Sequence, residues 1–313
     1  MIKTYTLKNE FLEITCLNLG CIIHEIKMKD SDGKIENIIH GFKNIEDYKT
    51  NDAYFGAVIG RTGGRICKGE FELNDVAYSV PTVDRGNALH GGASGFDKKY
   101  WDVVEKDNQL EFTYESKDGE EGFPGNLQVK VIYTLDGNQL KLDYYGTSDQ
   151  DTLLNMTNHA YFNLNPSDLI LDMDLKVESD FLIEIDETSI PTGILIPVED
   201  TPFDFRQSKK IGQDIDEEHV QLIRGGGYDH PWKLDGQVVL NTSNGRRVMM
   251  VSDQPCVVLY SYNFPVNDDP KHQALAVEFQ AEPDGIHHEG FTDSILRKGD
   301  TYRQTTVYTF EVV

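Results

Sequence analysis

Two segments of the chain place a histidine and a carboxylate where they could transfer protons. Residues 152–164 alternate between polar and apolar side chains with the period of a β-strand, and His159 lies in the middle of the polar row. Residues 272–280 alternate in the same way, and the alanines beside Glu278 leave room around its carboxylate. An imidazole and a carboxylate can deliver one proton and remove another near neutral pH. This pair therefore predicts general acid–base chemistry.

The polar row of residues 152–164 would suit a polyhydroxylated ligand, because each buried donor or acceptor must find a partner. Its members are Asn155, Thr157, His159, Tyr161 and Asn163. An ordinary surface strand has the same alternation, since one face of an antiparallel strand is normally wet. Glu278 could likewise be a surface residue of an edge strand. These two segments alone leave both interpretations open.

Three glycine-rich segments add candidate ligand-binding residues. The segments are residues 60–66, 87–92 and 225–232. They contribute Arg65, His90 and Asp229, and their glycines would let the backbone approach a ligand closely. The first segment has neither the Gly-Lys-Thr/Ser ending of a P-loop nor the spacing of a dinucleotide-binding loop. The pattern therefore argues against nucleotide binding.

The elements that must position these residues are almost all strands. Short runs rich in Val, Ile, Tyr, Phe and Thr recur along the chain, separated by Asp-Gly and Asn-Gly turns. The expected strands are residues 11–17, 21–28, 69–73, 110–116, 126–135, 139–148, 238–241, 248–252, 257–263 and 302–312. Helical periodicity is confined to residues 44–51 and 208–220. The pattern predicts an all-β sandwich or barrel, with residues 1–313 as a single domain.

The net charge of the chain excludes some classes of binding partner. With 29 basic and 53 acidic residues the net charge is -24, which repels phosphate backbones and anionic lipid surfaces. We therefore expect a small neutral ligand, no nucleic acid and no membrane. The first residues lack the apolar stretch of a signal peptide, and four scattered cysteines suggest reduced thiols, so we expect a cytoplasmic protein.

Six motifs in order along the chain resemble the aldose 1-epimerase family, also called galactose mutarotases. They are Gly60-Arg61 to Arg65-Ile66, Leu89 to Gly92 with Gly95-Phe96 and Trp101, Thr157 to Leu164, Thr201 to Arg206, Gly227 to His230, and Val277 to Gln280 with Pro283-Asp284. The resemblance runs nearly end to end. It implies a galactose mutarotase-like supersandwich of large antiparallel sheets, and an enzyme that interconverts the α and β anomers of free aldohexoses such as galactose and glucose.

The resemblance also implies roles for five residues. Glu278 would be the general base and His159 the general acid, while His90, Arg65 and Asp229 would bind and orient the sugar. No cofactor and no metal are expected.

One position departs from the family pattern. Members often have asparagine just before the second arginine of the first motif, where this chain has Gly64, so a side-chain hydrogen bond is expected to be lost. The spacing within the motif favours a structural role for Arg61. The resemblance therefore implies the type of reaction, and it leaves the preferred sugar open.

Other functions remain open from the sequence. Two histidines with carboxylates could ligate a metal in a hydrolase, although their spacing forms no local metal motif. A noncatalytic carbohydrate-binding protein would use the same polar strand and loops. A glycosidase is less well matched, because it canonically needs two catalytic carboxylates. The chain could be a monomer or a homodimer.

Overall fold

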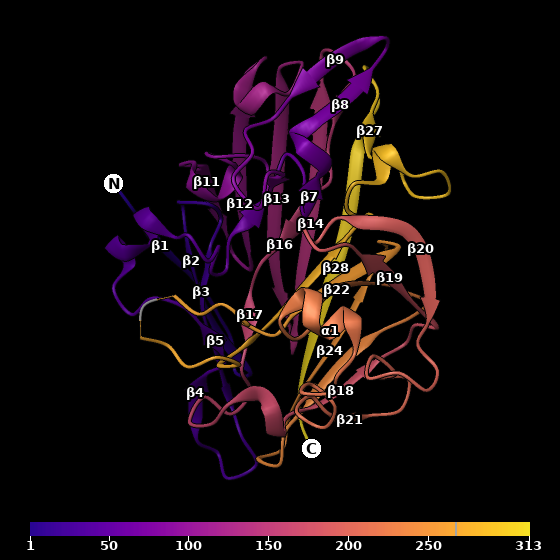
Figure 1. The fold of residues 1–313 in the computed structure, drawn as a ribbon. Helices are drawn as coiled ribbons and strands as arrows, with labels where there is room; N and C mark the ends of the chain where they lie inside the picture. The colour runs from indigo at the N-terminus through magenta and orange to yellow at the C-terminus, as the bar shows by residue number, and fades with distance from the viewer. Residues whose placement is uncertain (267) are drawn as a thin grey trace.

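The computed structural model describes residues 1–266 and 268–313, and strands dominate it (Figure 1). A nine-stranded antiparallel sheet has the order β11 (Asp102–Lys106), β12 (Gln109–Ser116), β13 (Leu127–Asp136), β14 (Gln139–Ser148), β28 (Tyr302–Val312), β24 (Arg246–Ser252), β23 (Val238–Asn241), β18 (Asp174–Val177) and β21 (Lys209–Lys210). A seven-stranded antiparallel sheet has the order β20 (Pro191–Pro197), β19 (Phe181–Ile185), β22 (Asp229–Lys233), β25 (Cys256–Tyr260), β26 (Leu275–Gln280), β17 (Tyr161–Phe162) and β5 (Ile39–His40).

Smaller sheets and short helical segments complete the structure. A four-stranded sheet is formed by β1 (Thr4–Lys8), β2 (Leu12–Leu17), β3 (Ile23–Lys29) and β4 (Ile35–Asn37). Two-stranded pairs are β7 (Arg65–Ile66) with β10 (Ala88–Leu89), β6 (Val58–Ile59) with β16 (Thr157–Asn158), β8 (Glu70–Leu73) with β9 (Val76–Ser79), and β15 (Thr152–Leu153) with β27 (Ile295–Leu296). The α-helix is α1 (Val220–Gly225), and the 3-10 segments are η1 (Ile45–Thr50), η2 (Cys67–Gly69), η3 (Phe96–Lys98), η4 (Glu120–Gly122), η5 (Ile170–Asp172) and η6 (Gly285–His287).

The main core lies between the two large sheets. Alternation along β13 buries every second side chain, as expected for a strand with one face on a core. The same core cluster takes Leu275, Val277 and Phe279 from β26 together with side chains of β13, β14, β24 and β28. Phe162 and Tyr308 meet across the sheets with ring centroids 5.5 Å apart. One face of β26 is therefore fixed by packing, which directs Glu278 and Gln280 to the opposite face.

The fold confirms the predicted all-β class and most of the strand predictions. Two predictions were wrong in part. The helix predicted for residues 208–220 is absent up to residue 219: this stretch contains β21 and turns, and α1 begins only at Val220. Residues 152–164 are not one strand but contribute the short strands β15, β16 and β17 to three different sheets. All residues of this segment are buried, although its three strands belong to different sheets.

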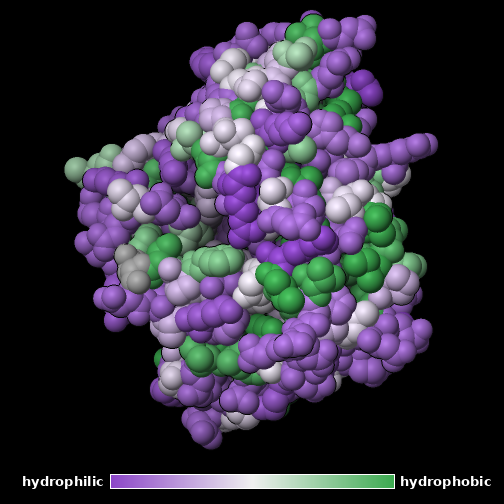
Figure 2. Space-filling model, in the orientation of Figure 1, coloured by the Kyte–Doolittle hydropathy of each residue, from purple (hydrophilic) through white to green (hydrophobic). Residues whose placement is uncertain are grey.

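The face of the molecule shown in Figure 2 is largely hydrophilic, with hydrophobic side chains gathered over α1 and β20. Val220 and Ile223 of α1 are exposed, as are Ile194 and Leu195 of β20. Across the described part of the chain, no helix is both long enough and apolar enough to cross a membrane.

Candidate active site

The pair of short strands β7 and β10 brings two predicted ligand-binding residues together. Leu89 pairs with Arg65, so His90 follows directly at the end of the pair. His90 and Gly64 then exchange two hydrogen bonds: the His90 backbone N–H donates to the Gly64 carbonyl (3.0 Å), and the Gly64 N–H donates to His90 Nδ1 (3.2 Å). Gly64 has a φ of +68°, a left-handed conformation that glycine adopts without strain. Gly64 thus contacts the histidine ring through its backbone.

His159 and Glu278 meet in the interior, although they come from different segments. His159 lies between β16 and β17, and its backbone N–H donates to Ala57. Glu278 lies on β26, an inner strand between β25 and β17, so the edge-strand interpretation is excluded. His159 Nε2 lies 3.3 Å from Glu278 Oε1, and the two residues are only 3% and 2% exposed. This is a buried acid–base pair in direct contact.

Arg65 lies in the same cavity and contacts two further carboxylates. Its Nε donates to Asp84 Oδ2 at 2.8 Å, and its terminal nitrogen lies 3.9 Å from Asp229 Oδ2. Asp229 opens β22 and pairs with Tyr260 of β25, so the strand fixes its position. A planar guanidinium held by two carboxylates has little rotational freedom, which suits the orientation of a ligand.

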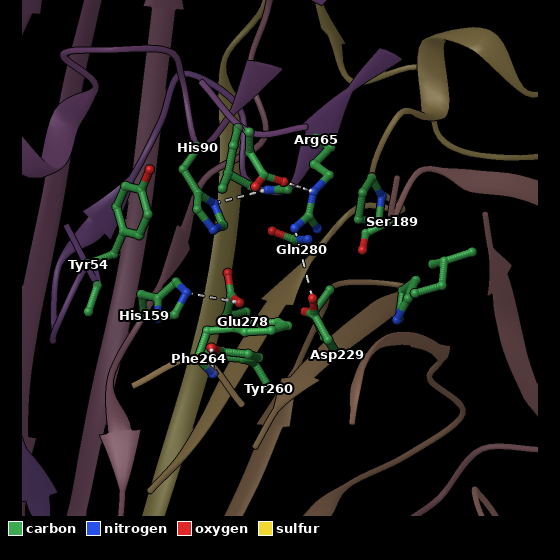
Figure 3. A pocket seen from close by; sticks show the side chains of 18 of the residues that line it. Tyr54, Arg65, His90, His159, Ser189, Asp229, Tyr260, Phe264, Glu278 and Gln280 are labelled. Carbon is green, nitrogen blue, oxygen red and sulfur yellow. Dashed lines mark hydrogen bonds and ion pairs between the residues drawn. The ribbon is translucent and has the colours of Figure 1, made fainter. Parts of the chain in front are cut away.

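All five predicted site residues line one cavity of about 220 Å³ (Figure 3). Its volume is below the roughly 300–1,000 Å³ typical of drug-sized ligand sites, which favours a small ligand. Residues that sequence reasoning did not assign to the site also line it, among them Tyr54, Asp84, Arg85, Ser189, Pro191, Tyr260, Phe264 and Gln280. The cavity therefore combines charged groups with aromatic and aliphatic walls.

Burial sets the protonation of His159 and Glu278. Removal from water, with a contribution from the charge of Asp229, raises the pKa of Glu278 to about 8, although Arg65 opposes the shift. Removal from water also lowers the pKa of His159 to about 3. At neutral pH the pair therefore carries one proton between its two members. That proton resides mainly on the carboxyl, because a buried ion pair is costly.

The surrounding groups are shifted by the same forces. Burial lowers the pKa of His90 well below its usual range, and the nearby His159 and Arg65 add to the effect. Burial raises the pKa of Asp229, opposed by Arg65. Burial would lower the pKa of Arg65, but Asp229 and Asp84 outweigh it and raise the value. Arg65 thus remains a cation at every working pH.

Several polar atoms of the cavity have no hydrogen-bond partner among the described residues. They are His159 Nδ1, Glu278 Oε2 and both amide atoms of Gln280. Unpaired buried polar atoms cost free energy unless they have a role, and they concentrate at functional sites. Gln280 lies two residues from Glu278 on the same face of β26, so the spacing of the strand could have indicated it.

Other members of the predicted polar row serve the fold instead. Asn155 exchanges hydrogen bonds with the backbone of Ala281, and Asn163 donates to the Gln273 carbonyl. Of the five residues in the row, His159 and Tyr161 line the cavity. The row therefore contributes two side chains to the cavity, whereas Asn155 and Asn163 hold the backbone.

Arg61 has the structural role expected from its spacing. It is 2% exposed, and its guanidinium donates to the carbonyls of Ser116, Lys117, Pro124 and Gly125 and to two hydroxyls. It is absent from the cavity wall. A single motif thus contributes one arginine to the fold and another, Arg65, to the site.

One cluster in the cavity has the composition of a metal site. His90, His159 and Glu278 each offer a ligand atom, and these atoms lie within 4.8 Å of one another. Two histidines and one carboxylate are a donor set that transition metals accept. The composition alone therefore does not separate an acid–base site from a metal site.

Comparison with known proteins gives a consistent result. The family model described as aldose 1-epimerase matches residues 3–309. A galactose mutarotase of Mus musculus is 36% identical, covering 99% of this chain and 94% of the mouse protein. An aldose 1-epimerase of Escherichia coli K12 is 32% identical, covering 98% and 95%.

Solved structures agree with the sequence comparisons. A GalM/aldose epimerase homologue from C. elegans is 28% identical, with a TM-score of 0.94 and complete coverage of both chains. A galactose 1-epimerase from Lactobacillus acidophilus, also 28% identical, has a TM-score of 0.89 and covers 100% of this chain and 98% of that one. The match therefore extends over both the sequence and the arrangement of the sheets, and the chain belongs to the aldose 1-epimerase family.

Proposed function

We propose that the protein is an aldose 1-epimerase that interconverts the α and β anomers of free aldohexoses such as galactose and glucose. The observation that carries this proposal is the buried contact between His159 and Glu278, which are 3.3 Å apart in a small cavity. Mutarotation needs a base for the C1 hydroxyl proton and an acid for the ring oxygen. A pair that shares one proton supplies both.

The roles of the pair follow from this proton count. Glu278 takes the proton of the C1 hydroxyl while His159 delivers one to the ring oxygen, and the open aldehyde then rotates and closes on its other face. The ionic form that starts this step, with Glu278 charged and His159 protonated, has the same number of protons as the neutral form. It is reached by moving the proton within the pair. Closure returns both groups to their starting states.

Three further residues bind and orient the sugar in this proposal. Arg65 donates to sugar hydroxyls through its fork of N–H groups, and Asp229 accepts from others. His90 completes the polar wall beside His159, with ring centroids 5.2 Å apart. Holding C1 and the ring oxygen against the pair gives the entropic advantage of a preorganised site.

Polarimetry tests the proposal directly. Freshly dissolved α-D-galactose and α-D-glucose should approach anomeric equilibrium faster with the protein than without it. Glu278→Gln should remove a factor of about 10² or more from this rate, since a positioned base or acid contributes roughly 10²–10⁴. Glu72→Gln, on an exposed position of β8, should leave the rate unchanged and serves as the matched control. Wild-type protein that accelerates neither sugar would contradict the proposal.

The cluster of His90, His159 and Glu278 keeps a metal-dependent hydrolase as a second candidate. A strong chelator separates the two candidates, because acid–base mutarotation should survive it and metal-assisted hydrolysis should not. Binding of galactose without any acceleration, in wild type and Glu278→Gln alike, would instead favour a carbohydrate-binding protein.

We further propose that the sugar is the main partner of a cytoplasmic monomer or homodimer formed by a single domain, residues 1–313. The net charge of -24 supports the proposal that nucleic acids and anionic membranes are not partners. Sedimentation analysis distinguishes monomer from dimer, and cell fractionation tests the location.

A further inference from the structure

The ring of His90 receives a hydrogen bond at Nδ1, and this contact determines where its proton lies. The donor is the backbone N–H of Gly64, 3.2 Å away. A backbone N–H can only donate, so Nδ1 must present a lone pair to it. A neutral imidazole then carries its single proton on the other nitrogen, Nε2.

The surroundings hold the ring in this orientation. His90 is 7% exposed, and its own backbone N–H donates to the carbonyl of the same Gly64. The ring also meets Tyr54 edge-on, with centroids 4.6 Å apart, and His159 at 5.2 Å. Reversing the ring would replace Nδ1 by a carbon and leave the Gly64 N–H unpaired, which costs about 1–3 kcal/mol when buried.

Burial also keeps the ring from becoming an imidazolium. Removal from water, with Arg65 and His159 close by, lowers the pKa of His90 well below its usual range. The acidic groups that line the cavity with His90 are Asp52, Asp84, Asp229 and Glu278. Arg65 engages Asp84 and Asp229, Asp52 is exposed, and Glu278, with a pKa raised to about 8 by burial, is mainly protonated at neutral pH. The neutral ring with its proton on Nε2 is therefore the form that the site favours at neutral pH.

We propose that His90 is a fixed hydrogen-bond donor, held by the Gly64 N–H as the Nε2–H tautomer, and that this N–H donates to an oxygen of the bound sugar. Figure 3 shows the ring directed toward the space between His159 and Arg65. His90 keeps its proton throughout the reaction, whereas His159 exchanges one. A neutral imidazole can polarise an oxygen in this way without transferring a proton. The sugar contact rests on the proposed function, but the tautomer does not.

The tautomer also weighs against a metal at the cluster of His90, His159 and Glu278. A metal-bound histidine directs a lone pair at the ion and usually donates its other N–H to an acceptor. In His90 the second nitrogen, Nδ1, accepts a hydrogen bond from the Gly64 N–H instead of donating one, so the proton of the ring lies on the nitrogen that would face the ion. Ligation through Nε2 would require the proton to move to Nδ1, against the Gly64 N–H. The cluster is therefore built for a donor rather than for a cation.

Nuclear magnetic resonance of the ligand-free, ¹⁵N-labelled full chain tests the tautomer without any substrate. Long-range ¹H–¹⁵N correlations distinguish the two tautomers and the imidazolium, and the signals that vanish in His90→Gln identify the ring. We expect a protonated Nε2 and an unprotonated Nδ1 that stay unchanged between pH 5 and 8. A proton on Nδ1, or an imidazolium forming within this range, would overturn the proposal. Perturbation of the His90 signals by equimolar Zn²⁺ would overturn the inference about the metal.

A pair of variants tests the donation to the sugar. The amide nitrogen of His90→Gln can reach the position of Nε2, whereas that of His90→Asn ends near Nδ1. His90→Gln should therefore retain at least tenfold more kcat/KM with galactose than His90→Asn, with both variants checked for folding by circular dichroism. Equal activity, or a more active Asn variant, would overturn the sugar contact. An inactive wild type would refute the proposed function and leave the tautomer result standing.

Discussion

Replacing Glu278 by glutamine should make the protein more stable while it removes activity. Glu278 is 2% exposed, and its pKa of about 8 lies above its ordinary value of 4.5. Between these two pH values the unfolded chain releases the proton and the folded chain keeps it. The native state of the wild type therefore loses stability as pH rises through this window, relative to a side chain that does not titrate.

The size of the effect follows from this difference. One pKa unit corresponds to about 1.4 kcal/mol, so between pH 4.5 and pH 7 the difference reaches about 3 kcal/mol in favour of the glutamine variant. It should be close to zero near pH 4.5 and stop growing above about pH 8. For a domain of this size the gain at pH 7 corresponds to a rise in Tm on the order of 5 °C.

Urea unfolding followed by circular dichroism at pH 5, 6, 7 and 8 measures the effect. Glu72→Gln is the matched control, because Glu72 is exposed on β8 and its replacement should change stability little at any pH. A Glu278→Gln variant that is no more stable than wild type at pH 7 would refute the reasoning. So would a gain in stability that does not change with pH.

Four other predictions follow from the site and its frame. The proposed reaction needs one proton on the pair of His159 and Glu278. A pH profile of kcat/KM should therefore fall above about pH 8, where Glu278 loses that proton, and again only in strong acid, where His159 adds a second proton to the pair. Activity that keeps rising above pH 8 would contradict this. Arg61→Met should lower the free energy of unfolding by at least about 3 kcal/mol in urea, because buried carbonyls lose their donor. Gly64→Ala should destabilise the fold and lower kcat/KM, because its Cβ would lie 2.6 Å from a Pro283 carbon at a φ of +68°; unchanged thermal unfolding and kinetics would exclude this. If residues 1–313 are one domain, calorimetry should show a single cooperative transition.

The sequence predicted the large strands well because their signal is local. The segments that became β13, β14 and β28 alternate over ten or more residues and lie between clear turns, so their bounds were nearly correct. The segment 152–164 failed as one strand because its breaks depend on which sheet each short piece joins. Neither the alternation nor the composition of the segment indicates which strand each piece will pair with. The helix predicted for residues 208–220 was also wrong, because β21 and turns occupy this segment up to Val220 and the sequence pattern did not indicate them.

The five site residues could be named because motifs identify them, but their environment could not. Asp84 engages Arg65 across 19 residues, and no spacing in the sequence links them. Arg85 reaches Ser189 across the cavity wall, a contact set entirely by tertiary structure. The donor to His90 is a backbone group of Gly64, which no side-chain motif can reveal. Candidate reactive residues can be identified from the sequence, whereas their hydrogen-bond partners become known only from the folded structure.

Burial explains how this site can carry out acid–base chemistry with so few groups. In water near neutral pH a glutamate would be ionised and a histidine would exchange between its neutral and protonated forms. Packed 3.3 Å apart and out of solvent, they are restricted to one shared proton across a wide range of pH. A reaction that returns both groups to their starting states needs only that proton. The free-energy cost of a buried carboxylate is thus the reason that the pair holds one proton at neutral pH. The same cost predicts that Glu278→Gln raises the stability of the fold while it lowers the activity.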